Sequence, residues 1–293
     1  MVGLVVTVLL GASSPQDSGA KAATGSVAEQ TAAFQSAINA KRFDEALKNS
    51  SQLVARYVEL GRQLAPNEPP KDPPKEAPTR DSLATAKNGR KQITDALEKA
   101  IKAPRLPAEF HEKLLAQFDA RTEDGDKLLE RWLDLSHIHD APITLAAGIK
   151  ALGTYRRVQY IERFEKYTIS DQRKPVLIAA AGALGEYFGE KEATRKRIVG
   201  NLILAYSSVG TGFVDKQKQR VLIDEELLLD VRHDFQYALA RLTGGVHFNR
   251  AKEWVEWWRN AKDAPLRDGV DRPKVQMDGI MPGPAPGSKP GGH

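Results

Sequence analysis

The chain contains no cysteine, which excludes a disulfide framework, a cysteine-based zinc site and a thiol nucleophile. It also lacks the period-two alternation of apolar and polar residues that predicts β-strands. No glycine-rich phosphate loop precedes a Lys-Ser or Lys-Thr pair, and no serine follows a strand as a nucleophile elbow requires. These absences predict an all-α protein that is not an enzyme and needs no cofactor.

A strong excess of one charge is missing as well. The 43 lysines and arginines stand against 38 aspartates and glutamates, which gives the 293 residues a formal charge of +5. Proteins that bind nucleic acid typically carry a larger and more clustered basic excess. The composition alone therefore gives little support for a nucleic-acid partner.

The start of the chain is an apolar run. Residues 2–10 are almost uninterruptedly apolar, but a membrane-spanning helix needs about 20 such residues. Small residues follow at 11–14 and then a polar stretch, which is the layout of a secretory signal peptide, although no lysine or arginine precedes the run. We expect an exported protein, periplasmic or extracellular, without a transmembrane span. The alternative is a cytoplasmic protein with a buried N-terminal segment.

Apolar residues recur at helical spacing along most of the remaining chain. The prolines that interrupt residues 65–79 remove backbone donors and restrict the residues before them, so this segment predicts a linker. The end of the chain is rich in glycine and proline and predicts disorder. The expected organisation is a signal-peptide-like leader over 1–25, a helical hairpin over 26–64, a Pro-rich linker over 65–80, a helical region over 81–136, helical repeats over 137–262 and a disordered tail over 263–293.

One phrase occurs twice in the second half of the chain. Residues 147–155 and 179–187 both read Ala-x-x-x-Ala-Leu-Gly-x-Tyr, and a looser third copy begins at Ala238-Leu239. Repeats at a period of tens of residues are typical of stacked units that cannot bury their apolar faces alone. Pro142 and Pro175 suit the first turn of a helix, and Gly153 suits a tight turn at a helix end. We expect the two copies to be neighbouring inner helices.

The repeat region resembles a HEAT-repeat protein. Val231-Arg232 followed by Ala238-Leu239 is similar to a HEAT core helix, and Leu242-Thr243-Gly244 fits its exit. Trp254, Trp257 and Trp258 resemble the closing helix of exported bacterial HEAT-repeat proteins. The resemblance covers about residues 140–262 and implies an armadillo-like α-solenoid, in which helical hairpins stack. It also implies a scaffolding role without shared catalytic residues.

His137 and His139, with Asp140 directly after them, form the only tight cluster of histidine-containing metal-ligand candidates. In an extended segment their imidazoles would point the same way, which leaves open a metal-dependent enzyme or accessory protein. A metal site needs further ligands, and the sequence places none. A turn between helices explains the same residues, so we predict no metal.

Three basic groups could form a binding surface. They are Arg195 with Lys196 and Arg197, Lys216 with Lys218 and Arg220, and the smaller pair Arg156 with Arg157. If stacking brought them onto one concave face, they would bind an acidic peptide, another polyanion or nucleic acid. Alternatively, nearby acidic residues such as Glu190 and Glu192 neutralise them locally. An exported protein rarely meets nucleic acid.

The sequence as a whole predicts a non-catalytic scaffold that binds another protein or a peptide through a helical-repeat surface. No small-molecule substrate is indicated.

Overall fold

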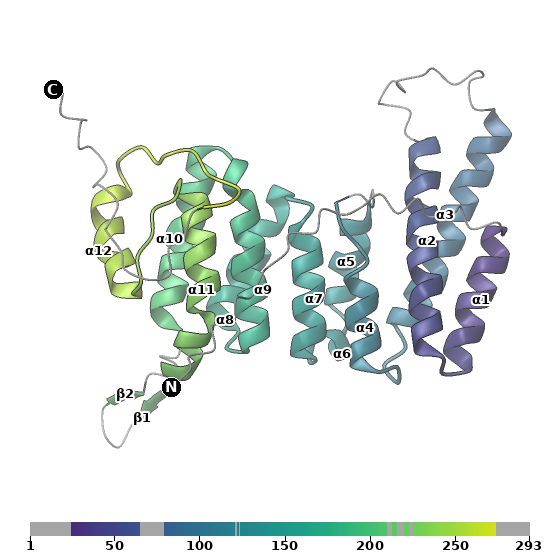
Figure 1. The fold of residues 1–293 in the computed structure, drawn as a ribbon, viewed down its shortest axis with the longest axis horizontal. Helices are drawn as coiled ribbons and strands as arrows, with labels where there is room; N and C mark the ends of the chain where they lie inside the picture. Colours follow the sequence, from purple (N-terminus) through teal and green to yellow (C-terminus); the bar gives the residue numbers. More distant parts are fainter. Residues whose placement is uncertain are drawn as a thin grey trace, which may run out of the picture.

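A computed structural model describes residues 25–64, 79–120, 122, 124–209, 213–215, 220–222 and 225–273. This part of the chain is helical, as predicted (Figure 1). The predicted leader and most of the predicted linker lie outside it, so both remain predictions. None of the helices that are described is long and apolar enough to cross a bilayer. The elements are α1 Val27–Asn39, α2 Phe43–Leu64, α3 Arg80–Ile101, α4 Ala108–Leu115, α5 Gly125–Leu133, α6 Ser136–His139, α7 Pro142–Gly153, α8 Ile161–Ser170, α9 Lys174–Gly185, α10 Glu192–Ser208, β1 Phe213–Asp215, β2 Arg220–Leu222, α11 Glu225–Leu242 and α12 Ala251–Ala261, with short 3₁₀ turns η1 Val158–Tyr160 and η2 Glu186–Gly189.

The first three helices form one unit. A capping box begins α1: the Ser26 hydroxyl accepts from the Glu29 amide, and the Glu29 carboxylate accepts from the Ser26 amide. Helix α3 packs against both α1 and α2 because its apolar side, with Ile93 and Leu97 buried, needs that cover. The Pro-rich segment therefore joins two helices of the same unit. The expectation that it separates a hairpin from a second region is wrong.

The remaining helices contact one another in two rows. Helix α7 packs against α4 and α9, and α9 packs against α11. In the second row α10 packs against α8 and α12, while α8 also contacts α9 and α10 also contacts α11. Figure 1 shows α7, α9 and α11 side by side in the middle of the molecule, with α1–α3 toward one end and α12 toward the other.

The repeated phrase forms the contacts between successive helices of the first row. Its copies lie in α7 and α9, and the third copy lies in α11. A Cβ added to Gly153 would lie 2.7 Å from the Cβ of Ala183, and one added to Gly185 would lie 3.1 Å from the Cβ of Ala238. The glycine of each of the first two copies thus packs against an alanine of the next copy.

These contacts also correct the predicted reason for a glycine at position 153, which was a tight turn at the helix end. Neither Gly153 nor Gly185 has a positive φ; within the described residues only Gly244 and Gly245 among the glycines do. Glycine is required at 153 because the neighbouring helix is too close for a side chain, and not because the turn is left-handed. Pro142 and Pro175 do lie in the first turns of α7 and α9, as predicted.

Two short strands depart from the all-helical expectation. Strands β1 and β2 pair antiparallel, with Val214 opposite Val221. They lie within the region predicted as helical repeats, and the next helix, α11, begins only at Glu225. Three residues per strand are too few for the alternation that sequence patterns detect.

The C-terminal region differs from the expected tail at its start. Residues 263–273, here called the strap, cross the ends of α10 and α11. The Leu266 amide donates to Glu192, and the Val270 amide donates to the Arg241 carbonyl. Asp271 pairs with Arg241 at 2.9 Å. Disorder was wrong for the strap because its partners lie far away in the sequence, whereas residues 274–293 lie outside the described residues.

The tryptophans of α12 close this end of the molecule. Trp254 is fully buried, and its indole nitrogen donates to the Phe248 carbonyl at 3.1 Å. Its ring packs edge-on against Phe248 and Trp257. Trp258 lies against Gly200 of α10, where a side chain would crowd the indole.

Candidate functional site: a groove across α7, α9 and α11

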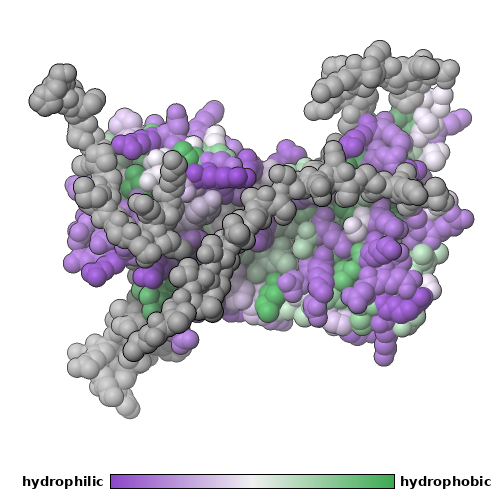
Figure 2. Space-filling model, in the orientation of Figure 1, coloured by the Kyte–Doolittle hydropathy of each residue, from purple (hydrophilic) through white to green (hydrophobic). Residues whose placement is uncertain are grey.

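A groove of about 740 Å³ runs across the first row of helices. We call it the alanine groove, because alanines from all three repeat copies line it. Figure 2 shows hydrophobic surface in the middle of this molecule, between hydrophilic regions toward both ends. The lining residues come from α4 and the turn after it (Glu112, Ala116, Phe118, Asp119), α7 and its C-cap (Ile143, Ala146, Ala147, Lys150, Ala151, Thr154), α9 and the residue after it (Pro175, Ile178, Ala179, Gly182, Ala183, Gly185, Glu186) and α11 (Asp234, Tyr237, Ala238, Arg241).

Small residues form much of the groove surface. A Cβ placed on Gly182 would meet no atom within 4 Å, so open space lies above α9 at this point. Ala147 is partly exposed, whereas Ala151, Ala183 and Ala238 are nearly buried. A surface without long side chains lets the backbone of a bound segment approach the helices closely.

Larger apolar side chains stand among these small residues. Ile143 is 60% exposed although it is an isoleucine on a helix, and Ile178 and Tyr237 are partly buried. The ring of Tyr237 stacks on that of His233, with centroids 6.2 Å apart. An exposed isoleucine beside an apolar hollow is typical of a surface that gains free energy by contact with a partner.

The charged residues of the groove are mostly acidic. Glu112, Asp119, Glu186 and Asp234 line it, together with Lys150 and Arg241. Burial raises the pKa of Asp234, and the nearby charges of His233 and Lys150 oppose this rise only in part.

Glu186 has its own partners at one end of the groove. It accepts from Arg156 at 2.8 Å and also pairs with Arg241, which in turn pairs with Asp271 of the strap. Although burial opposes them, the two arginines lower the pKa of Glu186. Both guanidinium groups also lie over the ring of Phe188. This network ties the ends of α7, α9 and α11 to the strap and leaves Glu186 and Arg241 neutralised by each other.

Lys216 and Lys218 of the predicted binding surface lie outside the described residues, and Arg220 lies in β2. The other five basic residues, Arg156, Arg157, Arg195, Lys196 and Arg197, do not line the groove. Each has a partner of its own within the described residues. Arg157 lies 3.7 Å from Asp126, Lys196 pairs with Glu192, and Arg197 pairs with Glu165. The sequence left two alternatives, a basic binding surface or neutralisation by nearby acidic residues such as Glu192. The structure places an acidic side chain beside each of these three basic residues.

Arg195 differs from the other four because it is buried, with 3% of its surface exposed. Its guanidinium donates to the carbonyls of Glu190, Leu242 and Arg267. It therefore fixes the strap to α10 and the end of α11. Its assignment to a binding surface is wrong, because a side chain with these contacts is not available to a partner.

The two candidate metal ligands are not extended but lie in the short helix α6. Residues two apart on a helix point in different directions. The Nε2 of His137 lies 2.7 Å from the Ile101 carbonyl, while His139 is exposed beside Asp140. No group of three or more histidine, aspartate or glutamate residues suited to a metal occurs in the part of the chain that is described. The extended geometry on which this alternative depended is absent.

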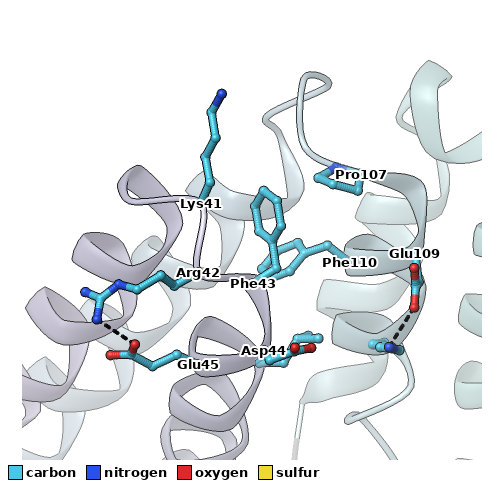
Figure 3. A pocket seen from close by; sticks show the side chains of 10 residues that line it. Lys41, Arg42, Phe43, Asp44, Glu45, Pro107, Glu109 and Phe110 are labelled. Atoms are coloured by element: carbon cyan, nitrogen blue, oxygen red, sulfur yellow. Dashed lines mark hydrogen bonds and ion pairs between the residues drawn. The ribbon is translucent and has the colours of Figure 1, made fainter.

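A second pocket of about 630 Å³ lies between the α1–α2 turn and the start of α4 (Figure 3). Phe43 and Phe110 face each other there with ring centroids 5.7 Å apart. Four of its six charged side chains pair within the pocket, Arg42 with Glu45 and Lys113 with Glu109, both at 2.7 Å. We interpret it as the joint between α1–α3 and the following helices, since most of its charged side chains pair with one another.

Comparison with protein-family models, with curated proteins and with solved structures finds no match to this chain. The alanine groove is therefore argued from its own geometry. The sequence placed these alanines in neighbouring inner helices and did not predict that they line an exposed groove. The feature of the sequence that could have indicated the groove was Ile143, an isoleucine directly after Pro142 in the first turn of α7.

Proposed function

We propose that this protein is a non-catalytic scaffold that binds a segment of another protein in the alanine groove. The observation that carries the proposal is a continuous, largely apolar groove that crosses α4, α7, α9 and α11 and retains an exposed isoleucine. A groove that crosses several helices suits an elongated ligand better than a compact one.

The proposal includes a HEAT-like α-solenoid for α7–α12. Two contacts support it: Gly153 against Ala183 and Gly185 against Ala238 repeat the same register between successive helices of one row. Repeats that contact only their neighbours form extended surfaces of the kind that solenoid proteins use for binding.

Ile143 provides the test, because the chain offers a matched control. Leu204 on α10 is 59% exposed, nearly the same as Ile143, but does not line the groove. Peptides selected from a random display library against the whole protein should lose affinity about tenfold on Ile143→Ser, because a buried aliphatic side chain contributes about 1.5 kcal/mol or more. Affinity can be measured by fluorescence anisotropy.

The same peptides should bind Leu204→Ser within about twofold of the unmodified protein, since that change is equally disruptive to an exposed site but lies elsewhere. The proposal fails if no peptide is enriched, or if the two substitutions weaken binding equally.

A further inference from the structure

We infer that the strap, residues 263–273, controls the alanine groove by fixing the ends of α9 and α11, so that the groove binds its partner tightly only while the strap is in place. This inference rests on the proposed function and adds its regulation. None of the strap residues lines the groove. Any influence of the strap on binding therefore passes through the residues that it contacts.

The strap is attached to one end of the groove through Arg241 of α11, which lines the groove. The Val270 amide donates to the Arg241 carbonyl at 2.8 Å, and Asp271 pairs with the Arg241 guanidinium at 2.9 Å. The same guanidinium pairs with Glu186, which follows α9 and also lines the groove. One ion-pair network thus joins the strap to the groove-lining ends of two helices.

The strap fits so closely that a single methyl group would displace it. A Cβ added to Gly269 would lie 2.7 Å from the carbonyl carbon of Phe188 and 3.0 Å from the carbonyl oxygen of Arg241. Both are backbone atoms, one in η2 directly after α9 and one in α11, and backbone cannot rotate away as a flexible side chain can. The buried Arg195 adds a second attachment, because its guanidinium donates to the Arg267 carbonyl at 2.6 Å.

The burial of Arg241 explains why this attachment matters for the groove. Its side chain is 7% exposed, and a buried guanidinium needs partners for its charge and its donors. Released from the strap, Arg241 would lose Asp271 and the cover over its carbonyl. We expect the ends of α9 and α11 to open locally more often in that state. A groove that is already ordered binds more tightly, because less conformational entropy is lost on binding.

Hydrogen exchange in the unmodified protein tests this coupling from the side of the strap. Coupling between two sites is reciprocal, so a partner that binds better to the strapped form must also stabilise the strap. The probe is a peptide selected from the display library whose binding depends on Ile143. At saturation it should slow exchange of the Leu266 and Val270 amides, both of which are hydrogen-bonded, about fivefold. Amides of α1 should keep their rates.

Gly269→Ala tests the coupling from the side of the groove, because it displaces the strap and alters no groove residue. It should weaken the same peptide about fivefold in fluorescence anisotropy. Gly89→Ala is the matched control. Its added carbon would lie 2.9 Å from Leu60 within α1–α3, so it also crowds a packed contact but lies outside the groove, and it should change affinity less than about twofold.

A milder variant keeps the test decisive if Gly269→Ala does not fold. Asp271→Asn retains the shape of the exposed Asp271 side chain and removes the charge that pairs with Arg241. It should weaken binding of the peptide about threefold, and the loss should diminish at high salt, which screens the ion pair in the unmodified protein. A salt-independent loss would assign the effect to packing and contradict the role given to this pair.

Three results would overturn the inference. The peptide could leave exchange of the strap unchanged, or Gly269→Ala and Gly89→Ala could have equal effects on affinity. Gly269→Ala could also strengthen binding, which would show that the strap obstructs the groove instead of supporting it. In each case a peptide that depends on Ile143 leaves the proposed function standing. If no peptide depends on Ile143, the proposed function and this inference both fail.

Discussion

Two glycines of the repeat region, Gly153 and Gly182, have opposite surroundings and therefore opposite roles. Gly153 ends α7 against the Cα and Cβ of Ala183, at 2.9 and 2.7 Å from where its own Cβ would be. Gly182 is exposed in the middle of α9 and has open space above it. The first glycine allows two helices to meet, and the second keeps the groove open. Sequence alone does not distinguish them, because both lie in helices rich in alanine.

Alanine substitutions at these two glycines should therefore change stability in opposite directions. Gly182→Ala should raise the free energy of unfolding by about 0.5–1 kcal/mol, because alanine is the better helix former and nothing obstructs its methyl group. Gly153→Ala should lower it by about 1–3 kcal/mol, because the added carbon meets backbone atoms of α9. Urea denaturation monitored by circular dichroism measures both. Two changes of the same sign would show that the α7–α9 contact is placed wrongly.

At the scale of elements, α3, α4 and α6 meet through histidines. His111 of α4 is buried, and its Nε2 lies 3.3 Å from the Ala100 carbonyl in α3. Its ring is 5.2 Å from that of His137 in α6. Burial lowers the pKa of His111, with a smaller contribution in the same direction from His137. Burial also lowers the pKa of His247.

These pKa shifts predict a loss of stability in mild acid. A histidine whose folded pKa lies below its unfolded value of about 6.5 binds a proton more readily in the unfolded chain. The free energy of unfolding should therefore fall as pH drops from about 7.5 to about 5.5, above the range in which carboxylates titrate. The dependence should be smaller in His111→Gln, which keeps a donor for the Ala100 carbonyl. If the free energy of unfolding of His111→Gln fell with pH as steeply as that of the unmodified protein, the lowered pKa assigned to His111 would be contradicted. His247→Gln measures the separate contribution of the other histidine with a lowered pKa.

For the molecule as a whole, local patterns predicted the helices and non-local contacts decided the rest. The repeated phrase predicted α7 and α9 because helix periodicity is local. It did not show that Ala147 faces a groove. The strap was missed because its order depends on Arg195, whose side chain reaches the Arg267 carbonyl 72 positions away. The sequence placed Arg156 in a basic surface because its ion-pair partner Glu186 is 30 positions away, so no acidic residue nearby in the sequence indicated the pair.

The most direct test of the account is to observe the alanine groove while a peptide binds. Since the chain has no cysteine, Gly182→Cys places a single thiol in the groove for an environment-sensitive fluorophore. Gly189→Cys is the control, because Gly189 is also exposed with no atom near its Cβ position and lies outside the groove. The account predicts that a peptide selected against the whole protein shifts the emission of the label at position 182 and leaves that at position 189 unchanged. Equal shifts at both positions, or none at 182 while anisotropy reports binding, would contradict it.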